Sequence, residues 1–193
     1  MTMRKLIVCN LISVDGFYSG PGDNVMAMPF DTTFSDYNAE RLRAADTLLL
    51  GRRSFEGFRD YWPAIADDPD QPAVEREISR LNNAIAKVVV SDTLTDADLG
   101  PWADTTVVSR SDAHEAIDEL KRGPGREILV FGSHVLWNDL LSGGLVDEVH
   151  LMIGSAFLGD GVPVFGGRRT DLRLLDVRRL GESQLILARY AAG

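Results

Sequence analysis

The chain has 193 residues, of which 45% are hydrophobic and 25% are charged, and its net charge is −9. This length and composition are typical of one globular domain, residues 1–193, with enough apolar residues for a sizeable core. The acidic balance argues against a nucleic-acid partner and against binding to an anionic membrane surface, because both attract basic proteins.

The first segment, residues 6–14, is rich in Ile and Val and is predicted to be a buried strand. It is too short for a membrane helix, which needs roughly 20 apolar residues, and no cleavage-site pattern follows it. The chain's single cysteine, Cys9, excludes an internal disulfide and suits a reducing compartment. The sequence therefore favours a cytoplasmic protein without a membrane span.

Helices and strands alternate through most of the chain. After a glycine-rich loop at 15–23, the residues from Thr33 to Asp36 resemble a capping box that begins a helix ending near residue 45. An apolar strand at 47–50 precedes a helix that begins at Arg52 and is expected to stop at Pro63. The elements expected next are a helix around 74–81, strands at 87–90 and 105–108, a helix capped by Ser111 and ending at 123–125, a strand at 127–131, a helix around 135–141 and a strand at 146–153.

The last two strands, at 172–177 and 185–190, are joined by a tight turn near Gly181 and should form an antiparallel hairpin. The alternation of strands and helices before them is typical of a largely parallel sheet that helices cover. The sequence therefore predicts an α/β fold with a mixed, mostly parallel sheet and a C-terminal antiparallel hairpin.

The most informative motif is Gly51-Arg52-Arg53-Ser54, where an apolar strand ends and a helix begins. A helix start attracts anions through its unpaired N–H groups and its dipole, and guanidinium groups add charge suited to phosphate. Arginines in a first helical turn oppose the dipole unless an anion compensates them. The motif therefore predicts a site for a phosphate-bearing ligand such as a dinucleotide, although a solvated helix start is the simpler alternative.

A second turn from strand to helix lies at Gly132-Ser133-His134, and the strands at 87–90 and 105–108 end next to Ser91 and Arg110. Each of these is weak evidence alone, because Ser133 and Ser91 are also common cap or turn residues. If the strands are parallel, however, all their carboxyl ends meet at one edge, where open α/β sheets bind ligands. We therefore expect one crevice shared by these turns and Gly51.

Asp15 follows the first strand and precedes a glycine. Its carboxylate could bind substrate or relay a proton, or Asp15-Gly16 could be an ordinary turn. Several aromatic side chains could line a slot for a flat ring, with core packing as the alternative for any one of them. These are Phe17, Tyr18, Phe34, Tyr37 and Trp62.

Other common sites are not supported. The chain lacks the G-x-G-x-x-G pattern of an ordinary Rossmann site, and residues 161–166 lack the lysine of a phosphate-binding P-loop. The three histidines are dispersed, so we expect no metal site.

Six short segments, in this order along the chain, carry a resemblance to a known family. They are residues 13–17, 50–56, 87–94, 131–133 with Leu136, 140–141 with 144–148, and 158–165. With these segments the sequence resembles the dihydrofolate-reductase-like superfamily, specifically the reductase domain of bacterial riboflavin biosynthesis and its stand-alone relatives. The resemblance implies a three-layer fold, NADPH as the hydride donor, and a pterin or pyrimidine-like heterocycle as the acceptor. A homodimer follows only by analogy with the family.

The resemblance also implies roles for the residues of the crevice. Those that would contact the cofactor are Gly51, Arg52, Arg53 and Ser54 at its phosphates, Ser91 and Arg110 near the adenosine, and Gly132, Ser133 and His134 along the pyrophosphate and nicotinamide. Asp15 would be catalytic at the substrate end, with Phe17 and Phe34 beside the substrate. The family commonly has paired glycines where this chain has Gly132-Ser133. That difference leaves a second reading open, a catalytically silent module that binds a nucleotide or flavin.

Overall fold

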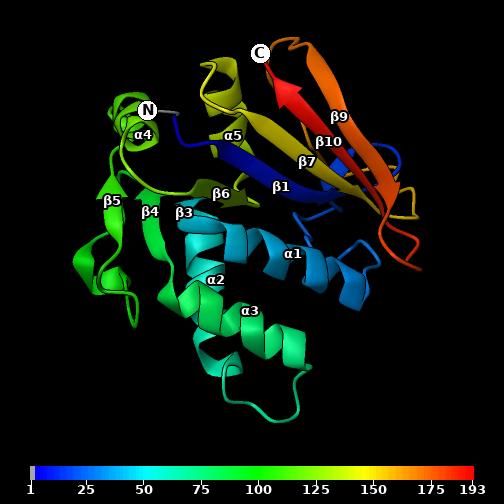
Figure 1. Cartoon of the computed structure of the whole chain (residues 1–193), viewed down its shortest axis with the longest axis horizontal. Helices are drawn as coiled ribbons and strands as arrows, with labels where there is room; N and C mark the ends of the chain where they lie inside the picture. Colours follow the sequence, from blue (N-terminus) through cyan, green and yellow to red (C-terminus); the bar gives the residue numbers. More distant parts are fainter. Residues whose placement is uncertain (1–2) are drawn as a thin grey trace.

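The computed structural model describes residues 3–193 and is built around one eight-stranded sheet (Figure 1). The strand order is β5-β4-β3-β6-β1-β7-β10-β9. The six strands from β5 to β7 run parallel, and β10 and β9 add antiparallel pairings at one edge. The strands are β1 (Leu6–Ile12), β3 (Ala45–Gly51), β4 (Ala86–Val90), β5 (Thr106–Val108), β6 (Glu127–Phe131), β7 (Glu148–Ile153), β9 (Leu172–Arg179) and β10 (Ile186–Ala192).

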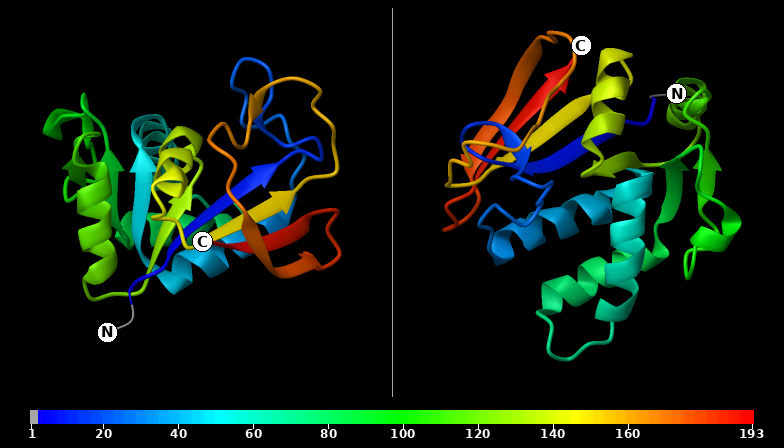
Figure 2. Two further views of the ribbon diagram at one scale, coloured as in Figure 1. Left: turned by 90° about the horizontal axis from the view of Figure 1, so that it is seen from above. Right: turned by 180° about the vertical axis from the view of Figure 1, so that it is seen from behind.

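Helices cover both faces of this sheet, which confirms the predicted three-layer fold (Figure 2). On one face lie α1 (Thr32–Ala44), α2 (Arg52–Ile65) and α3 (Ala73–Ala84), and on the other α4 (Ala113–Arg122) and α5 (His134–Ser142). Each face has its own apolar core, centred on side chains such as Leu50 and Phe55 on the first and Val8 and Leu140 on the second. Within residues 3–193, no helix has both the length and the apolar character needed to cross a membrane.

Several predicted boundaries are wrong. The helix α1 begins at Thr32, because the carboxylate of Asp31, not Thr33, caps it by accepting the Thr33 N–H at 3.0 Å. Asp112 rather than Ser111 precedes α4, and the Ser111 hydroxyl bonds to Ser109 Oγ instead. The first strand ends at Ile12.

The glycine-rich loop contains a short strand, β2 (Phe17–Ser19), which pairs antiparallel with β8 (Val162–Pro163) from a distant part of the chain. A 3₁₀ turn at Asp96–Asp98 connects β4 to β5.

The helix α2 does not stop at Pro63. It continues to Ile65 and includes the proline in its last turn. There Pro63 removes only one hydrogen bond near the helix end, and the buried Ile65 beyond it packs into the protein. Burial of this residue outweighs the local preference of proline to end a helix.

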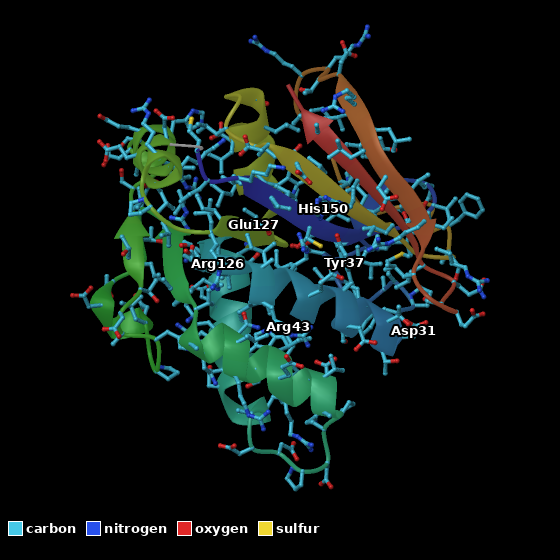
Figure 3. The ribbon with its side chains drawn as sticks, viewed as in Figure 1. Asp31, Tyr37, Arg43, Arg126, Glu127 and His150 are labelled. Carbon is cyan, nitrogen blue, oxygen red and sulfur yellow. The ribbon has the colours of Figure 1, made fainter. Side chains whose placement is uncertain are left out.

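A buried polar network joins α1 to the sheet beneath it. Tyr37 and His150 lie together between α1 and β7 (Figure 3), with 2.8 Å between Tyr37 Oη and His150 Nδ1. The other ring nitrogen of His150, Nε2, is 2.9 Å from Glu148 Oε2. A carboxylate can only accept, so Nε2 carries the hydrogen, and Nδ1 accepts from the tyrosine. Arg189 and Lys5 donate to the same carboxylate at 3.0 and 2.6 Å.

This network predicts a loss of stability in acid. Burial lowers the pKa of His150 to about 4, from about 6.5 in an unfolded chain. As pH falls from 6.5 towards 4, the unfolded chain binds a proton at His150 that the folded chain does not. The free energy of unfolding should therefore fall by up to about 3 kcal/mol over this window. Denaturant titrations of His150→Gln at each pH should show a flatter dependence, whereas substitution of the half-exposed His114 should not. An unchanged slope in His150→Gln would contradict this assignment.

Candidate functional site

The candidate site lies where two neighbouring parallel strands are followed by helices that cover opposite faces of the sheet. The strands β3 and β6 are adjacent, but α2 follows β3 onto one face and α5 follows β6 onto the other. Such a switch point leaves a crevice beyond the carboxyl ends of the strands, where open α/β sheets bind ligands. The strands β4 and β5 end at the same edge. The predicted common edge for Gly51, Ser91, Arg110 and Gly132 is therefore confirmed.

Two hydrogen bonds, which we call the serine clasp, join the starts of α2 and α5. The N–H of Gly51 donates to Ser133 Oγ at 3.0 Å, and the N–H of Ser133 donates to Ser54 Oγ at 3.0 Å. Ser133 has a left-handed backbone, with φ at +53°. Its hydroxyl turns towards Gly51, so the serine at the second position of Gly132-Ser133 links the starts of the two helices.

Both helices begin without the side chains that usually compensate a helix N-terminus. Neither Gly51 before α2 nor Ser133 before α5 makes a side-chain cap, and neither first turn contains an acidic residue. Arg52 and Arg53 stand in the first turn of α2 with guanidinium-bearing side chains that are 48% and 84% exposed. Arg53 pairs with Asp23 at 3.3 Å. Two adjacent helix starts with two accessible arginines form a site suited to a multiply charged anion.

Tyr18 covers Gly132 at the centre of this site. A Cβ added to Gly132 would lie 3.0 Å from Tyr18 Oη and 3.1 Å from Ser54 Oγ, and the φ of this glycine is +56°. A larger residue would be both crowded and strained there. The Tyr18 ring lies 4.9 Å from that of His134, centre to centre. Burial raises the pKa of Tyr18 to about 12, so its hydroxyl keeps its proton at neutral pH, and burial also lowers the pKa of His134.

Ser91 and Arg110 lie at the same edge of the sheet, but their side chains interact with residues of the neighbouring loops. The Ser91 hydroxyl oxygen accepts the N–H groups of Thr93 and Leu94 at 3.2 and 3.0 Å, as expected of a turn residue. Its hydroxyl proton remains available for donation. The Arg110 guanidinium is 3.5 Å from Asp92 and is largely exposed.

Asp15 connects two loops rather than pointing an unpaired carboxylate at the crevice. Its two oxygens accept the N–H groups of Leu158 and Gly159 at 3.1 and 2.7 Å. A hydrogen bond from Ser13, together with these backbone bonds, lowers the pKa of Asp15 to about 2. At neutral pH it is therefore an ionised acceptor that holds the 158–159 segment, which favours the turn interpretation over that of a proton relay.

The aromatic side chains do not form one slot. Tyr37 is buried against His150, and Trp62 packs against Phe58 and Tyr61. Phe34 lies beside Phe30 near the start of α1, with ring centres 5.1 Å apart. Phe17 is half-buried on β2, where it pairs with Pro163.

The role of Tyr18 over Gly132 could not be read from the sequence, because β2 reaches this position through its pairing with β8. Asp23, the partner of Arg53, also has no signal in the sequence besides its charge.

The serine clasp gives a first test of this geometry. Ser133→Ala should lower the free energy of unfolding by about 1–3 kcal/mol, because the Gly51 N–H loses its buried acceptor. Ser133→Gly loses the same acceptor but removes the left-handed strain, so it should cost about 1 kcal/mol less than the alanine. Denaturant unfolding of both variants beside Ser111→Ala, at an exposed position, measures the difference. Equal stability of Ser133→Ala and the wild type would show that the hydrogen bond from the Gly51 N–H to Ser133 contributes nothing to stability.

Comparisons with known proteins agree with this architecture. An uncharacterized protein of Bacillus subtilis, YyaP, is 30% identical over 182 residues, covering 92% of this chain and 90% of its own. A deaminase and 5-amino-6-(5-phosphoribosylamino)uracil reductase from Thermotoga maritima superposes with a TM-score of 0.67 at 13% identity, over 99% of this chain and 57% of that one. Dihydrofolate reductase from Enterococcus faecalis, complexed with NADP(H), superposes with a TM-score of 0.56 at 14% identity, over 98% of this chain and 96% of that one.

The structural similarities establish a dihydrofolate-reductase-like fold, in agreement with the resemblance seen in the sequence. The model of one protein family, the RibD C-terminal domain, matches residues 4–186, nearly the whole length described above. The chain therefore belongs to the RibD C-terminal domain family, a family of reductases.

Proposed function

We propose that this protein is an NADPH-dependent reductase of a pterin or pyrimidine-like heterocycle. The observation that carries the proposal is the pair of uncapped helix starts of α2 and α5, which the serine clasp joins, with two accessible arginines in the first turn of α2. That arrangement fits the several phosphates of a dinucleotide better than a single carboxylate or sulfate. Membership of a reductase family and the NADP(H) complex of the dihydrofolate reductase neighbour support the choice of cofactor.

The residues present fit the phosphates of this cofactor. The N–H groups of the first turns of α2 and α5 would hold the pyrophosphate, and Arg52 and Arg53 would neutralise the cofactor's phosphates, including the 2′-phosphate of NADPH. Ser54 accepts the Ser133 N–H, and its own hydroxyl proton is free for a phosphate oxygen. The bound cofactor would supply the hydride, and the protein would supply alignment and charge. Arg110 and Ser91, at the ends of β5 and β4, would lie towards the adenosine.

The substrate end of the proposed site lies beyond β1. There the Asp15 bonds to Leu158 and Gly159 fix the loop that carries Phe17, and Phe34 stands at the start of α1. Flat rings bind well against aromatic side chains. The Thermotoga maritima neighbour acts on 5-amino-6-(5-phosphoribosylamino)uracil by its name, and the other neighbour on dihydrofolate. A heterocycle of this class is the substrate we propose.

A second candidate is a catalytically silent module that binds a nucleotide or flavin on the same fold. It is favoured by the engagement of Asp15, because both carboxylate oxygens already accept backbone hydrogens and its pKa is lowered to about 2. At neutral pH this carboxylate is ionised, so it has no proton to give to a heterocycle that accepts a hydride.

Calorimetry and a turnover assay separate the two candidates. Titration of the protein with NADPH should give saturable binding, and absorbance at the reduced nicotinamide band should fall when a dihydropterin or aminouracil is added. Absence of NADPH and NADP⁺ binding at millimolar concentration would overturn the proposed cofactor. NADPH binding without oxidation, across a panel of pterins and aminouracils, would favour the silent module.

A further inference from the structure

Asn10 carries a buried side-chain amide without a hydrogen-bond partner. The residue is 3% exposed, and among residues 3–193 its Nδ2 atom has no acceptor. A buried donor that stays unpaired lowers stability, and for this reason most buried polar side-chain atoms are paired. Departures from this rule concentrate at functional sites, where stability is lost in exchange for binding. The unpaired amide therefore marks Asn10 as a candidate ligand contact.

The register of the sheet places Asn10 beside the turn at Gly132. The strands β1 and β6 run parallel, and their last paired residues are Cys9 and Phe131. Beyond this pair β6 ends, whereas β1 continues, with Asn10 paired to Leu151 of β7. Neighbouring strands lie about 4.8 Å apart. Asn10 and Gly132 are therefore neighbours at the edge of the sheet that carries the candidate site.

The side chain of Asn10 lies on the face of the sheet that α5 covers. Side chains alternate between the two faces along a strand, and Val8, two residues before Asn10, belongs to the core beneath α5. Phe34, at the proposed substrate end, packs with α1 on the opposite face. Asn10 therefore faces the side on which His134 begins α5, which is the cofactor side of the proposed site.

Tyr18 of β2 reaches the same place from a different part of the chain. The strand β2 packs against β1, and Tyr18 Oη lies 3.0 Å from the position that a Cβ on Gly132 would take. Its ring lies 4.9 Å from that of His134, centre to centre. A flat ring bound against the Gly132 backbone would therefore take the position of the tyrosine ring, next to Asn10.

We propose that Asn10 recognises the bound ring, with Nδ2 donating a hydrogen bond to a carbonyl oxygen of a ring held against Gly132. This inference rests on the proposed function and makes Asn10 a specificity-determining residue of that site. An amide nitrogen has two N–H groups and no charge, which suits a neutral acceptor. The carboxamide of nicotinamide and the lactam of a pterin or pyrimidine both supply one. The face on which Asn10 lies favours the nicotinamide.

A purely structural role fits Asn10 less well, as a comparison with Asn138 on α5 shows. The Nδ2 atom of Asn138 donates to the carbonyl oxygens of His134 and Val164 at 2.7 and 3.1 Å. Its Oδ1 atom accepts the N–H of Gly166 at 3.0 Å. Asn138 thereby joins α5 to the segment after β8. The Nδ2 atom of Asn10 makes no such bond within residues 3–193, so it does not hold two segments together.

The test compares two ligands that differ in the ring. NADPH and 2′-phospho-ADP-ribose share the phosphates and the adenosine, but only NADPH carries nicotinamide. Asn10→Leu keeps the branching of asparagine and lacks the donor. In this variant the dissociation constant for NADPH, divided by that for 2′-phospho-ADP-ribose, should rise about 5–20-fold. Asn10→Ala, which is smaller, should give the same change and serves if the leucine does not fold.

Stability and a matched control give two further readouts. Ligand-free Asn10→Leu should melt about 2–4 °C above the wild type, because no unpaired donor is then buried. Asn82 is also a buried asparagine, and among the described residues its Oδ1 has no partner. It lies on α3, far from α5 (Figure 1). Asn82→Leu should change the ratio of dissociation constants less than twofold.

The outcomes separate this inference from the proposed function. A wild type that binds neither ligand would overturn the proposed function and the Asn10 contact with it. If the wild type binds both, equal weakening of the two ligands by Asn10→Leu would overturn the role of Asn10 alone. So would an unchanged ratio with unchanged binding of pterin to the NADP⁺ complex. Weakening confined to pterin would support the hydrogen bond and assign the carbonyl oxygen to the heterocycle.

Discussion

Replacing Arg52 and Arg53 together with alanine is expected to raise the dissociation constant for NADPH about 30–100-fold and that for NADH only a few-fold. Hydrogen bonds to charged groups contribute about 1.5–3 kcal/mol each. The two side chains are 48% and 84% exposed, so solvent reduces their effect. A combined loss of about 2–3 kcal/mol gives the expected ratio. The difference between the cofactors arises because only NADPH carries the 2′-phosphate.

Parallel calorimetric titrations with the two cofactors measure this difference directly. Arg122→Ala is a suitable control, because Arg122 is an exposed arginine on α4, paired with Asp118 and remote from the crevice. It should leave both constants unchanged. Equal weakening of NADPH and NADH by the double substitution would show that the arginines neutralise the pyrophosphate but do not recognise the 2′-phosphate.

The two arginines should not contribute equally. Arg53 is paired with Asp23 across 3.3 Å and must leave this partner to reach a ligand, whereas Arg52 is only within 4.0 Å of Glu56. Exposed pairs of this kind stabilise by less than about 1 kcal/mol, so the exchange is inexpensive. Arg52→Ala is therefore expected to weaken NADPH binding somewhat more than Arg53→Ala does.

The sheet edge that carries the candidate site could be located from the sequence because its signals are local. An apolar run that ends at a glycine followed by polar residues predicts the end of a buried strand and the start of a helix, and Gly51 and Gly132 both meet this description. Parallel strands then place such ends at one edge. The confirmed parts of the fold follow from the same kind of pattern, since buried parallel strands have nearly continuous apolar sequences.

The features that could not be predicted depend on contacts between distant segments. Tyr18 reaches Gly132 only because β2 pairs with β8. The clasp between Ser54 and Ser133 spans 79 residues. Pro63 remains helical because Ile65 after it is buried, and Asp15 accepts N–H groups 143 and 144 residues away. Local preferences for turns, caps and helix ends carry no information about such partners.

Substitution of Glu148 should have the largest effect on stability. Its carboxylate is nearly buried and accepts from Lys5, His150 and Arg189 at once. Although burial opposes ionisation, these hydrogen bonds lower the pKa of Glu148 to about 2. Glu148→Ala would leave the positive charge of Arg189 beside a buried histidine without an anion. Removal of one partner from a buried ion pair costs about 3–5 kcal/mol.

Denaturant unfolding at pH 7 measures this loss, and Glu148→Gln separates its causes. The glutamine keeps the shape and one acceptor oxygen but lacks the charge, so it should cost less than the alanine. Glu182→Ala is the matched control: Glu182 also pairs with an arginine, Arg179, but its side chain is 97% exposed. It should change stability by less than about 0.5 kcal/mol. A loss below about 1 kcal/mol in Glu148→Ala would mean that the sheet tolerates the unpaired charges and that this network does not hold α1 on β7.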